Sequence, residues 1–386
     1  MTSTSAKPAP PTSDSALDPF ELTASWIEEL NRDIEGYDSL AEFPWDKWKI
    51  IQRSGILALP VDKRYGGRGG TLTETMRALE RLGFACRDAG LSFSASTQIV
   101  SVGVPLQAFA SEELKSRYLP RIASGELVTA HAITEPEHGS DAMNITTTAR
   151  PDGDEYVIDG GKMFITNAPI ADLFLVYVRT GDPGPFGLSV FVIERGTPGL
   201  TIGKPLDKMG LRTSPLSEVT FEALRVPAAH RIGGEGAGFL ILDHVMKREI
   251  LFSFSLTLGE MSHRLQRVIR FAKQRRQFDQ PIGRFQGVSH RIADMKIAVE
   301  TSRKWLADTG AKVEAGQDAA IDIAATKTVV SEANKATALD ALQIFGGQGY
   351  LTATGIEREV RNALGGTIYS GTNEIQRNRI AALLGL

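Results

Sequence analysis

The sequence is poor in the residues that build disulfide frameworks and metal sites. Its 386 residues include a single cysteine, Cys86, which excludes an intramolecular disulfide, and six histidines without the spacing of a zinc site. No extended basic block accompanies the net charge of -3, so we expect no nucleic-acid partner. Apolar runs fall far short of the roughly 20 residues that a membrane-spanning helix needs. These absences predict a soluble, cytoplasmic protein with no structural metal and no membrane insertion.

The periodicity of the apolar residues changes twice along the chain. Residues 1–17 are rich in Ser, Thr, Ala and Pro and are expected to form a disordered tail. Helical spacing dominates residues 18–127, a period of two marks residues 128–233, and helical spacing returns in residues 234–386. The longest helices of the last part are expected near residues 239–275, 285–315 and 320–345. The fold class is therefore α+β, with an N-terminal helical domain, a middle β-domain and a C-terminal helical bundle.

Several local patterns indicate where elements begin and turn. Helical spacing follows Thr71, and Ser111 has the character of an N-cap. The glycines of residues 65–70 favour a turn, because no apolar strand leads into them as a dinucleotide-binding loop requires. Asp159-Gly160 is expected to turn between two strands of residues 155–166. Further strands are expected at residues 173–178, 188–193 and 219–221.

A loop signature lies near the start of the β-domain. Residues 133–141 read I-T-E-P-E-H-G-S-D. A Gly-Ser turn lets backbone N–H groups and a hydroxyl approach a pyrophosphate without a side-chain clash. Taken alone, the pattern favours a simple Pro-Gly loop capped by Asp141, so its meaning depends on the motifs that accompany it.

Further motifs follow in a fixed order. Residues 162–167 read K-M-F-I-T-N, residues 208–214 read K-M-G-L-R-T-S, and residues 275–278 read R-R-Q-F. Residues 343–350 read Q-I-F-G-G-Q-G-Y, and the tail 368–377 reads I-Y-S-G-T-N-E-I-Q-R. With the loop signature, this series resembles the acyl-CoA dehydrogenase family from about residue 20 to the last residue. We assign no chemical role to the K-M-G-L-R-T-S segment.

The resemblance implies a bound FAD and the residues that contact it. Thr134 and Ser140 would contact FAD, Phe164 would pack against the isoalloxazine, and the Thr166 hydroxyl would bond near flavin N5. An aromatic on a strand, such as Phe164, is otherwise most often simple core. The remaining implied FAD contacts are Arg275, Phe278, Gln286, Gln343, Gly346, Gly347, Thr372 and Glu374, several of which would reach a cofactor in a neighbouring subunit. Sharing of FAD implies at least a homodimer, and the family implies a homotetramer.

The resemblance also implies a reaction, and one residue of the tail departs from it. The family oxidises an acyl thioester by removing a proton from Cα while hydride leaves Cβ for flavin N5. Ser370 stands where many members carry the glutamate base, and a serine hydroxyl is a poor base near neutral pH. The Ser370 N–H remains available as a donor to the thioester oxygen. In isovaleryl-CoA and long-chain acyl-CoA dehydrogenases the base lies ten residues before a glycine, and Glu249 has that spacing to Gly259.

A helix argument supports Glu249 independently of the family. The residues that share its helix face are Val245, Met246, Phe252 and Ser253, with no cation among them. We expect its pKa to rise in such surroundings, unless it pairs with a distant Arg or Lys in the fold. By contrast, Asp243 has Lys247 four residues on, and Glu260 has His263 and Arg264 on its helix face. Both carboxylates are therefore expected to form ordinary solvated pairs.

The acyl carrier and the electron acceptor stay open. Ile250 stands where the family often has Arg near the substrate, and Asp279 replaces a usual Gly, which puts the local turn there in question. Residues 164–172 and the tail are also similar to prolyl-carrier-protein dehydrogenases, so the substrate is an acyl-CoA or an acyl group on a carrier protein. The electron acceptor is an electron-transfer flavoprotein or another acceptor. A flavin oxidase or monooxygenase, or a non-catalytic flavoprotein, remains an alternative on the same fold.

Overall fold

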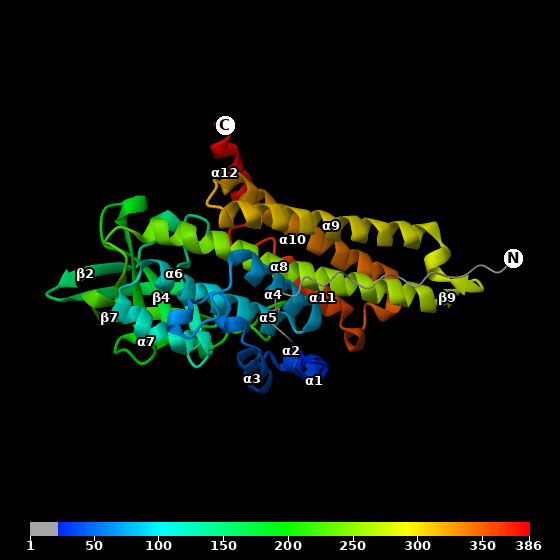
Figure 1. The fold of residues 1–386 in the computed structure, drawn as a ribbon, viewed down its shortest axis with the longest axis horizontal. Coiled ribbons are helices and arrows are strands. Elements are labelled where there is room, and N and C mark those ends of the chain that lie inside the picture. The colour runs from blue at the N-terminus through cyan, green and yellow to red at the C-terminus, as the bar shows by residue number, and fades with distance from the viewer. Residues whose placement is uncertain (1–21) are drawn as a thin grey trace.

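The computed structural model describes residues 22–386, so the expected disordered tail of residues 1–17 lies outside the described residues. The described chain passes through a helical part, a sheet and a helical bundle. In Figure 1 the sheet lies at the left, the longest helices run lengthwise to the right, and α12 projects from the top. None of the described helices combines the length and the apolar character that a membrane span requires.

The first part of the described chain is helical. It contains α1 (Ala24–Leu30), α2 (Ile34–Leu40), α3 (Trp45–Ser54), α4 (Leu72–Ala85), α5 (Ala89–Gln98), a π-helical turn (Ile99–Gly103), α6 (Val104–Phe109) and α7 (Glu112–Ala123). Thr71 begins α4 with a capping box, in which its hydroxyl accepts from the Glu74 N–H and the Glu74 carboxylate accepts from the Thr71 N–H. The Ser111 hydroxyl accepts from the Leu114 N–H at the start of α7. The predicted helix after Thr71 and the predicted N-cap at Ser111 are both confirmed.

The middle of the chain forms one sheet with a helix-facing side. Its strands are β1 (Thr129–Ala132), β2 (Thr148–Asp152), β3 (Glu155–Thr166), β4 (Leu173–Arg179), β5 (Leu188–Glu194), β6 (Leu200–Ile202), β7 (Leu216–Pro227) and β8 (Arg231–Ile232). The strand order is β6-β7-β3-β2-β4-β5-β8, and β1 pairs in parallel with β4 so that His131 lies opposite Leu175. Because side chains alternate along a strand, Leu175 and Tyr177 of β4 join the core shared with the helices. Phe174 and Val176 face the second core on the other side.

The structure confirms one of the two turn predictions and corrects the other. Gly66 forms a turn with a φ of +77° directly after the short 3-10 helix Lys63–Tyr65, and residues 67–70 are irregular. The expected turn at Asp159-Gly160 is wrong, because β3 runs through Glu155–Thr166 without a break and pairs along its length with β7. Gly160 has a φ of +142° at a shift of register, and a Cβ there would lie 2.7 Å from the Thr147 Cα. The glycine therefore permits a bulge and a close approach of backbone rather than a reversal.

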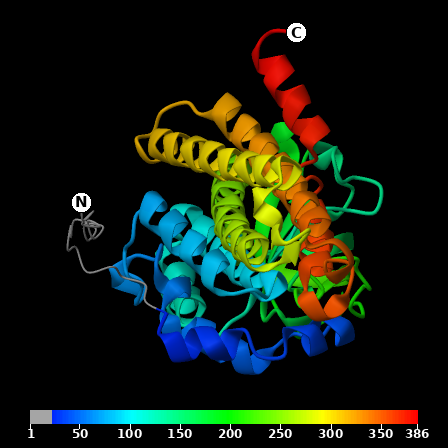
Figure 2. The ribbon, with the colours of Figure 1, turned by 90° about the vertical axis from the view of Figure 1, so that its right-hand side faces the viewer.

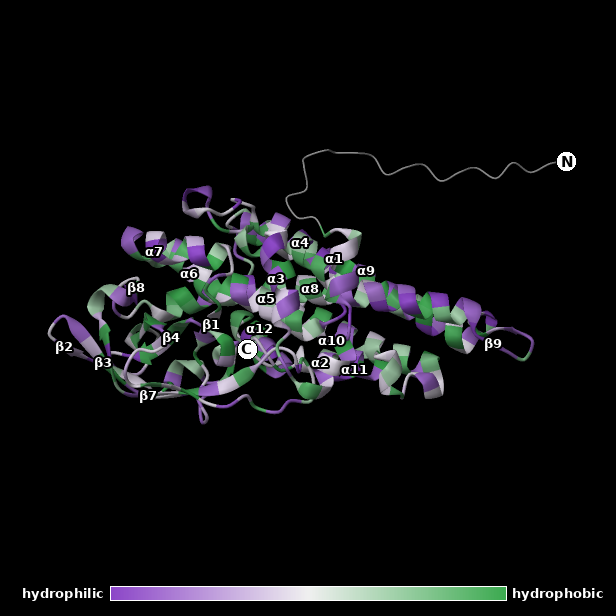
Figure 3. Cartoon of the chain, turned by 90° about the horizontal axis from the view of Figure 1, so that it is seen from below, coloured by the Kyte–Doolittle hydropathy of each residue, from purple (hydrophilic) through white to green (hydrophobic). Residues whose placement is uncertain are grey.

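The last part of the chain is a helical bundle around one long helix. It contains α8 (Gly238–Gln274), β9 (Arg276–Gln277), β10 (Gln280–Pro281), α9 (Gln286–Glu314), α10 (Ala320–Phe345), α11 (Ile356–Gly365) and α12 (Asn373–Leu383). The three long helices expected from the sequence are confirmed. Viewed from the end, α8 lies between the blue N-terminal helices and the yellow and orange helices α9 and α10 (Figure 2). Hydrophobic and hydrophilic residues alternate along the long helices that reach toward β9 (Figure 3).

Two glycines let α8 cross α4 at close range. A Cβ on Gly83 would lie 2.0 Å from the Leu256 carbonyl oxygen, and a Cβ on Gly259 would lie 2.0 Å from the Glu80 carbonyl oxygen. No other residue fits such a contact between backbones. Gly259 is the glycine that lies ten residues after Glu249, so the spacing that singled out this glutamate has a packing reason: the crossing fixes the position of α8 relative to the N-terminal helices.

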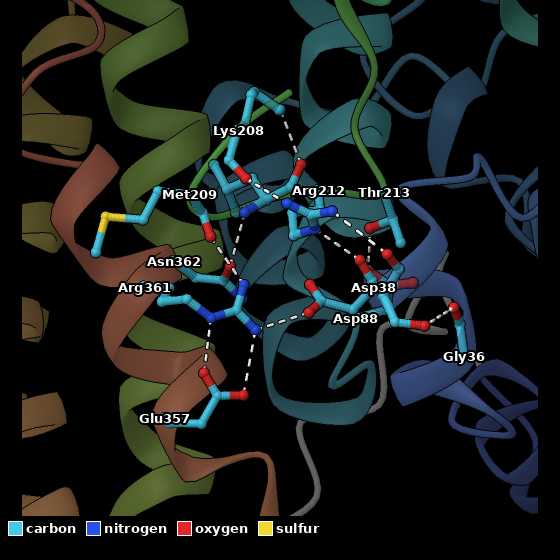
Figure 4. Close-up of polar contacts among 12 residues, drawn as sticks. Gly36, Asp38, Asp88, Lys208, Met209, Arg212, Thr213, Glu357, Arg361 and Asn362 are labelled. Carbon is cyan, nitrogen blue, oxygen red and sulfur yellow. Dashed lines mark hydrogen bonds and ion pairs between the residues drawn. The ribbon is translucent and has the colours of Figure 1, made fainter. Parts of the chain in front are cut away.

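The K-M-G-L-R-T-S segment at residues 208–214 ties the three parts together (Figure 4). Arg361 of α11 donates to the Met209 carbonyl at 2.8 Å and forms a 2.7 Å ion pair with Asp38 of α2. Arg212 completes the contact by donating to the Asp38 carbonyl at 2.7 Å. Because α11 leads directly into the tail motif, this network holds in place the segment on which the candidate active site depends.

Candidate active site

Glu249 lies on the side of α8 that faces the core. Val245 and Phe252, one helical turn to either side, are buried, and Ile250 is 1% exposed. The Glu249 side chain is 23% exposed, and burial raises its pKa above the usual range, while a hydrogen bond from Ser370 opposes that rise. Among the described residues no lysine or arginine pairs with Glu249, so the alternative of a distant cation is not supported.

The structure brings the two candidate catalytic residues together. The Ser370 hydroxyl donates to Glu249 Oε1 at 2.5 Å across 121 positions of sequence. Ser370 has a φ of +55°, and Gln376 holds the turn from behind by donating to the Ser370 carbonyl at 2.9 Å. Within residues 22–386 the Ser370 N–H meets no acceptor, so it is free to donate to a ligand. The Glu249 carboxylate and the free Ser370 N–H therefore lie close together at the turn that contains Ser370.

The second oxygen of Glu249 faces a histidine that the sequence analysis did not single out. His131 Nδ1 lies 3.8 Å from Glu249 Oε2, and the His131 side chain is 9% exposed. Burial, with a smaller effect from Lys162, lowers the pKa of His131 to about 4, so the imidazole is neutral at neutral pH. The buried Tyr177 ring meets the His131 ring edge-on at 5.0 Å between centroids. The strand register, which places both side chains on the helix-facing side, is not readable from sequence.

Aromatic side chains form a wall beside the same carboxylate. Tyr369, the residue before Ser370, stacks on Phe254 at 5.7 Å and contacts Phe93 at 4.9 Å between ring centroids. Burial raises the pKa of Tyr369 to a value beyond its ordinary range, and the Glu249 charge adds to the effect. Aromatic surface therefore limits the access of water to one side of the carboxylate.

A buried ion pair shapes the loop signature. Lys162 of β3 donates to Glu135 at 2.8 Å, and both side chains are almost completely buried. Glu135 also accepts from the Thr146 and Thr147 N–H groups at 2.6 and 2.8 Å. Burial acts against ionisation of Glu135, but these donors and Lys162 outweigh it and lower its pKa to about 2. The pair fixes the loop so that Thr134 is half-buried and Ser140 is exposed at its edge.

The strand motif presents its aromatic outward. Phe164 is 54% exposed and has a φ of +59°, so it is not the core residue that an aromatic on a strand usually is. Thr166 is half-buried on the same strand, and Asn167 anchors the end of the motif by donating to the Ser94 carbonyl at 3.2 Å. An exposed aromatic face beside a hydroxyl fits a planar ring system such as an isoalloxazine.

The implied FAD contacts of the turn after α8, of the start of α9 and of the end of α10 lie far from Glu249 within one chain. Arg275 and Phe278 lie in the turn after α8, and the ring of Phe271 stacks on that of Phe345 at 4.1 Å, which joins this turn to the end of α10. Gln286, Gln343, Gly346 and Gly347 belong to the same end of the bundle, opposite the sheet (Figure 1). Phe278 is 86% exposed. One chain therefore presents these residues outward rather than gathering them around its own Glu249.

Two further expectations concern the turn after α8 and the tail. Asp279, which replaces a glycine, has a φ of +61°, so the left-handed turn is kept without glycine. The Thr372 hydroxyl caps α12 by accepting from the Ile375 N–H at 3.3 Å, and Glu374 is exposed in the first turn. Both tail residues remain able to reach a ligand.

The expectation of two solvated pairs holds for one carboxylate on α8 and fails for the other. Asp243 pairs with Lys247 at 2.6 Å, as predicted. The pairing of Glu260 with Arg264 is wrong, because Arg264 turns to Glu359 at 2.7 Å. Burial raises the pKa of Glu260 to about 7. Among the described residues, no cluster of His, Cys, Asp or Glu has the arrangement of a metal site.

Comparisons with known proteins agree over all three parts of the chain. The family models described as the N-terminal, middle and C-terminal domains of acyl-CoA dehydrogenase match residues 23–126, 130–224 and 236–385. The chain is 41% identical over 342 residues to an L-prolyl-(peptidyl-carrier protein) dehydrogenase of Pseudomonas fluorescens, which covers 88% of this chain and 90% of that protein.

Solved structures show the same arrangement. The crystal structure of the prolyl acyl carrier protein oxidase AnaB superposes with a TM-score of 0.91 and 38% identity, over 94% of this chain and 97% of that one. An FAD complex of PigA superposes with a TM-score of 0.90 and 39% identity, over 95% and 99% of the two chains.

Proposed function

Since the chain belongs to the acyl-CoA dehydrogenase family, we propose that Glu249 removes the Cα proton of an acyl thioester bound beside it. The relatives identify the protein as an FAD-dependent oxidoreductase that acts on CH–CH donors. FAD supplies the acceptor for the hydride that leaves Cβ. The observation that supports the base assignment best is the 2.5 Å contact between Ser370 and Glu249.

Several residues of this chain would contribute to removal of the Cα proton. The raised pKa of Glu249, caused by burial, brings the carboxylate closer to the range in which a base is effective. Ser370 acts twice: its hydroxyl keeps Glu249 Oε1 in place, and its free N–H donates to the thioester oxygen as charge develops there. The aromatic wall of Tyr369, Phe254 and Phe93 keeps water from the carboxylate.

We further propose that two subunits hold each FAD. From one subunit Thr134, Ser140, Phe164 and Thr166 approach the cofactor beside Glu249, and Thr372 and Glu374 approach it from the tail. The contacts from the partner copy are Arg275, Phe278, Gln286, Gln343, Gly346 and Gly347. Exposed apolar side chains on the helical bundle support this division: Phe278 is 86% exposed, Ile297 of α9 is 62% exposed and Leu339 of α10 is 48% exposed. This sharing requires at least a homodimer, and membership of the family favours a homotetramer.

The substrate that we propose is an acyl group on a carrier protein, with prolyl as the first candidate. The similarity to a prolyl-carrier-protein dehydrogenase supports it. Ile250, which stands where the family often has a substrate-side arginine, is 1% exposed and cannot serve an acyl-CoA in that way. The neighbouring cation, Arg248, donates instead to the His244 carbonyl at 3.1 Å within α8. Acyl-CoA remains the alternative substrate.

Anaerobic bleaching of the flavin tests the proposal. The purified protein should be yellow, and mixing with prolyl carrier protein should bleach the flavin faster than mixing with acyl-CoA thioesters. Glu249→Gln should slow bleaching by roughly 100- to 10,000-fold, the usual contribution of a general base. Glu260→Gln, which removes a buried carboxylate from the same helix, should bleach at the parental rate. Equal rates for the parent and Glu249→Gln would show that the base lies elsewhere, and no bleaching of the parent by any thioester would favour the non-catalytic alternative.

An oxidase is a second candidate, favoured by the similarity to AnaB, whose structure is described as that of an oxidase. In that case the reduced flavin should return to yellow within a turnover time when air is admitted. Slow return in air, with fast return on addition of an electron-transfer flavoprotein, would favour a dehydrogenase that uses a protein acceptor. A cytoplasmic location remains a prediction from the sequence.

A further inference from the structure

Ser370 contacts only one carboxylate oxygen of Glu249, Oε1. The other, Oε2, faces His131 Nδ1 at 3.8 Å. In structures without a bound substrate, catalytic hydrogen bonds are often long and tighten when the substrate binds. The side chain of His131 is about nine-tenths buried, so Glu249 and not bulk water lies in front of its Nδ1.

The far side of the imidazole limits what His131 can do. Its Nε2 is buried and has no hydrogen-bond partner among the described residues, and the Tyr177 ring meets the imidazole edge-on, with 5.0 Å between the centroids. A neutral imidazole carries one N–H, and the tautomer with that hydrogen on Nδ1 is the one that meets a partner, the Glu249 carboxylate. The geometry therefore favours donation from Nδ1 to Oε2.

We propose that His131 is a positioning residue that holds the second carboxylate oxygen of Glu249 through its Nδ1–H. The inference rests on the proposed role of Glu249 as base. Ser370 and His131 would then fix the carboxylate from both oxygens, so that its free lone pairs point at one place where the substrate Cα must lie. Neither side chain touches the reacting carbon, so both act through Glu249.

A neutral donor suits this task better than a charged one. A lysine or protonated histidine beside Glu249 would lower the pKa of the carboxyl strongly and weaken it as a base. His131 stays neutral because burial, aided by Lys162, lowers its pKa to about 4. It can orient the carboxylate and still leave its pKa raised.

Few other titratable groups face this carboxylate. The Glu249 charge raises the pKa of Tyr177 on β4 and of Tyr369 after α11, and both phenols stay neutral because burial has the larger effect. On α8 itself, Lys247 pairs with Asp243 at 2.6 Å. Of the described residues, Ser370 and His131 are the donors that contact a Glu249 oxygen, at 2.5 and 3.8 Å.

Three substitutions at position 131 separate a hydrogen-bond role from a packing role. Asparagine presents an N–H close to the position of Nδ1, whereas glutamine presents it one atom farther out and leucine presents none. In His131→Leu the Glu249 carboxylate loses a hydrogen-bond donor, so its pKa should rise by about one unit. The acidic limb of the pH profile of kcat/KM for anaerobic flavin reduction should move to higher pH by the same amount. His131→Asn should keep the parental limb. His230→Leu, at the outer end of the β-domain, is the matched control for loss of an imidazole and should leave the limb unchanged.

A second readout needs no turnover. The infrared band of a protonated buried carboxyl, assigned to Glu249 by its absence in Glu249→Gln, should titrate at higher pH in His131→Leu than in the parent and in His131→Asn. If His131→Leu does not retain flavin, His131→Gln replaces it, since it fills the space but displaces the N–H, and its titration should move in the same direction.

The outcomes are distinguishable. Parental titration of Glu249 in all three substitutions would overturn the proposal, and so would equal shifts in all three, which would indicate packing. If Glu249→Gln bleaches like the parent, the proposed base fails, but the infrared titration still decides whether His131 donates to Glu249.

Discussion

Replacing Ser370 with alanine removes one atom from the candidate site and leaves the backbone in place. The lost group is the hydroxyl that donates to Glu249 Oε1 at 2.5 Å. The Ser370 N–H, which we assign to the thioester oxygen, is retained, so the variant separates the two roles of this residue.

The expected magnitude follows from the strength of a hydrogen bond to a charged group. Such a bond contributes about 1.5 to 3 kcal/mol, which corresponds to about one to two pKa units. Because burial already raises the pKa of Glu249 and Ser370 opposes the rise, Ser370→Ala should raise it further. The acidic limb of kcat/KM should move to higher pH by about one to two units, with bleaching on that limb slowed about 10- to 100-fold. Well above the limb the rate should approach that of the parent.

Stability should change with the opposite pH dependence to that of a paired carboxylate. A group whose folded pKa is raised stabilises the protein least above that pKa, so Ser370→Ala should lower the free energy of unfolding at pH 9 and hardly at pH 5. Ser370→Gly loses the same hydroxyl but accepts the φ of +55° without strain, so it should share the limb shift and be about 1 kcal/mol more stable than Ser370→Ala. Stopped-flow bleaching across pH and urea unfolding measure both effects. A parental acidic limb in Ser370→Ala would refute the link between Ser370 and the base.

Three further predictions concern the frame of the site. Burial raises the pKa of Glu260 to about 7, so between pH 4.5 and 7 the folded protein holds a proton that the unfolded chain releases, and its stability falls as the pH rises. Glu260→Gln should flatten this dependence in urea titrations and add up to about 3 kcal/mol at pH 8, whereas an unchanged slope would contradict the assignment. Glu135→Gln leaves Lys162 buried without its partner, which should cost about 3 to 5 kcal/mol and lower both Tm and flavin content; parental flavin content would disprove a role for this pair in the loop. Gly259→Ala should cost about 1 to 3 kcal/mol, because its Cβ would lie 2.0 Å from a carbonyl oxygen of α4, while Gly287→Ala, which meets nothing within 4 Å, should not destabilise.

The prediction that Glu249 is the base rests on a local signal. Ten residues separate Glu249 from Gly259, and the glycine marks the place where two helix backbones touch, so a short-range pattern reports on a tertiary crossing. The absence of a cation one turn away was equally visible. The three long helices followed from the same periodicity.

Predictions failed where a distant segment decides the local outcome. Asp159-Gly160 has the character of a hairpin turn, but β7 pairs along the whole of β3 and turns the glycine into a bulge. Arg264 lies four residues after Glu260 and still prefers Glu359, which reaches it from α11. A turn or an ion pair predicted from one segment does not form when another part of the fold provides a better partner.

His131 was missed for a related reason. A single histidine on a strand is most often a core residue. The position of His131 opposite Glu249 depends on the parallel register of β1 and β4, and no residue of β1 indicates that register. The available signal was its place two residues before the loop signature that begins at residue 133.

The left-handed turn at Ser370 bears on how such a site can evolve. Its φ of +55° and the grip of Gln376 on the Ser370 carbonyl set the direction of the N–H without any help from the side chain. The side chain at this position is therefore free to vary while the N–H that we assign to the thioester oxygen keeps its direction. A lineage could exchange a carboxylate here for a hydroxyl once α8 supplied another carboxylate within reach, and each intermediate would keep that backbone N–H in place. Under the proposed mechanism, the turn lets the position of the base vary while the position of the oxyanion donor stays fixed.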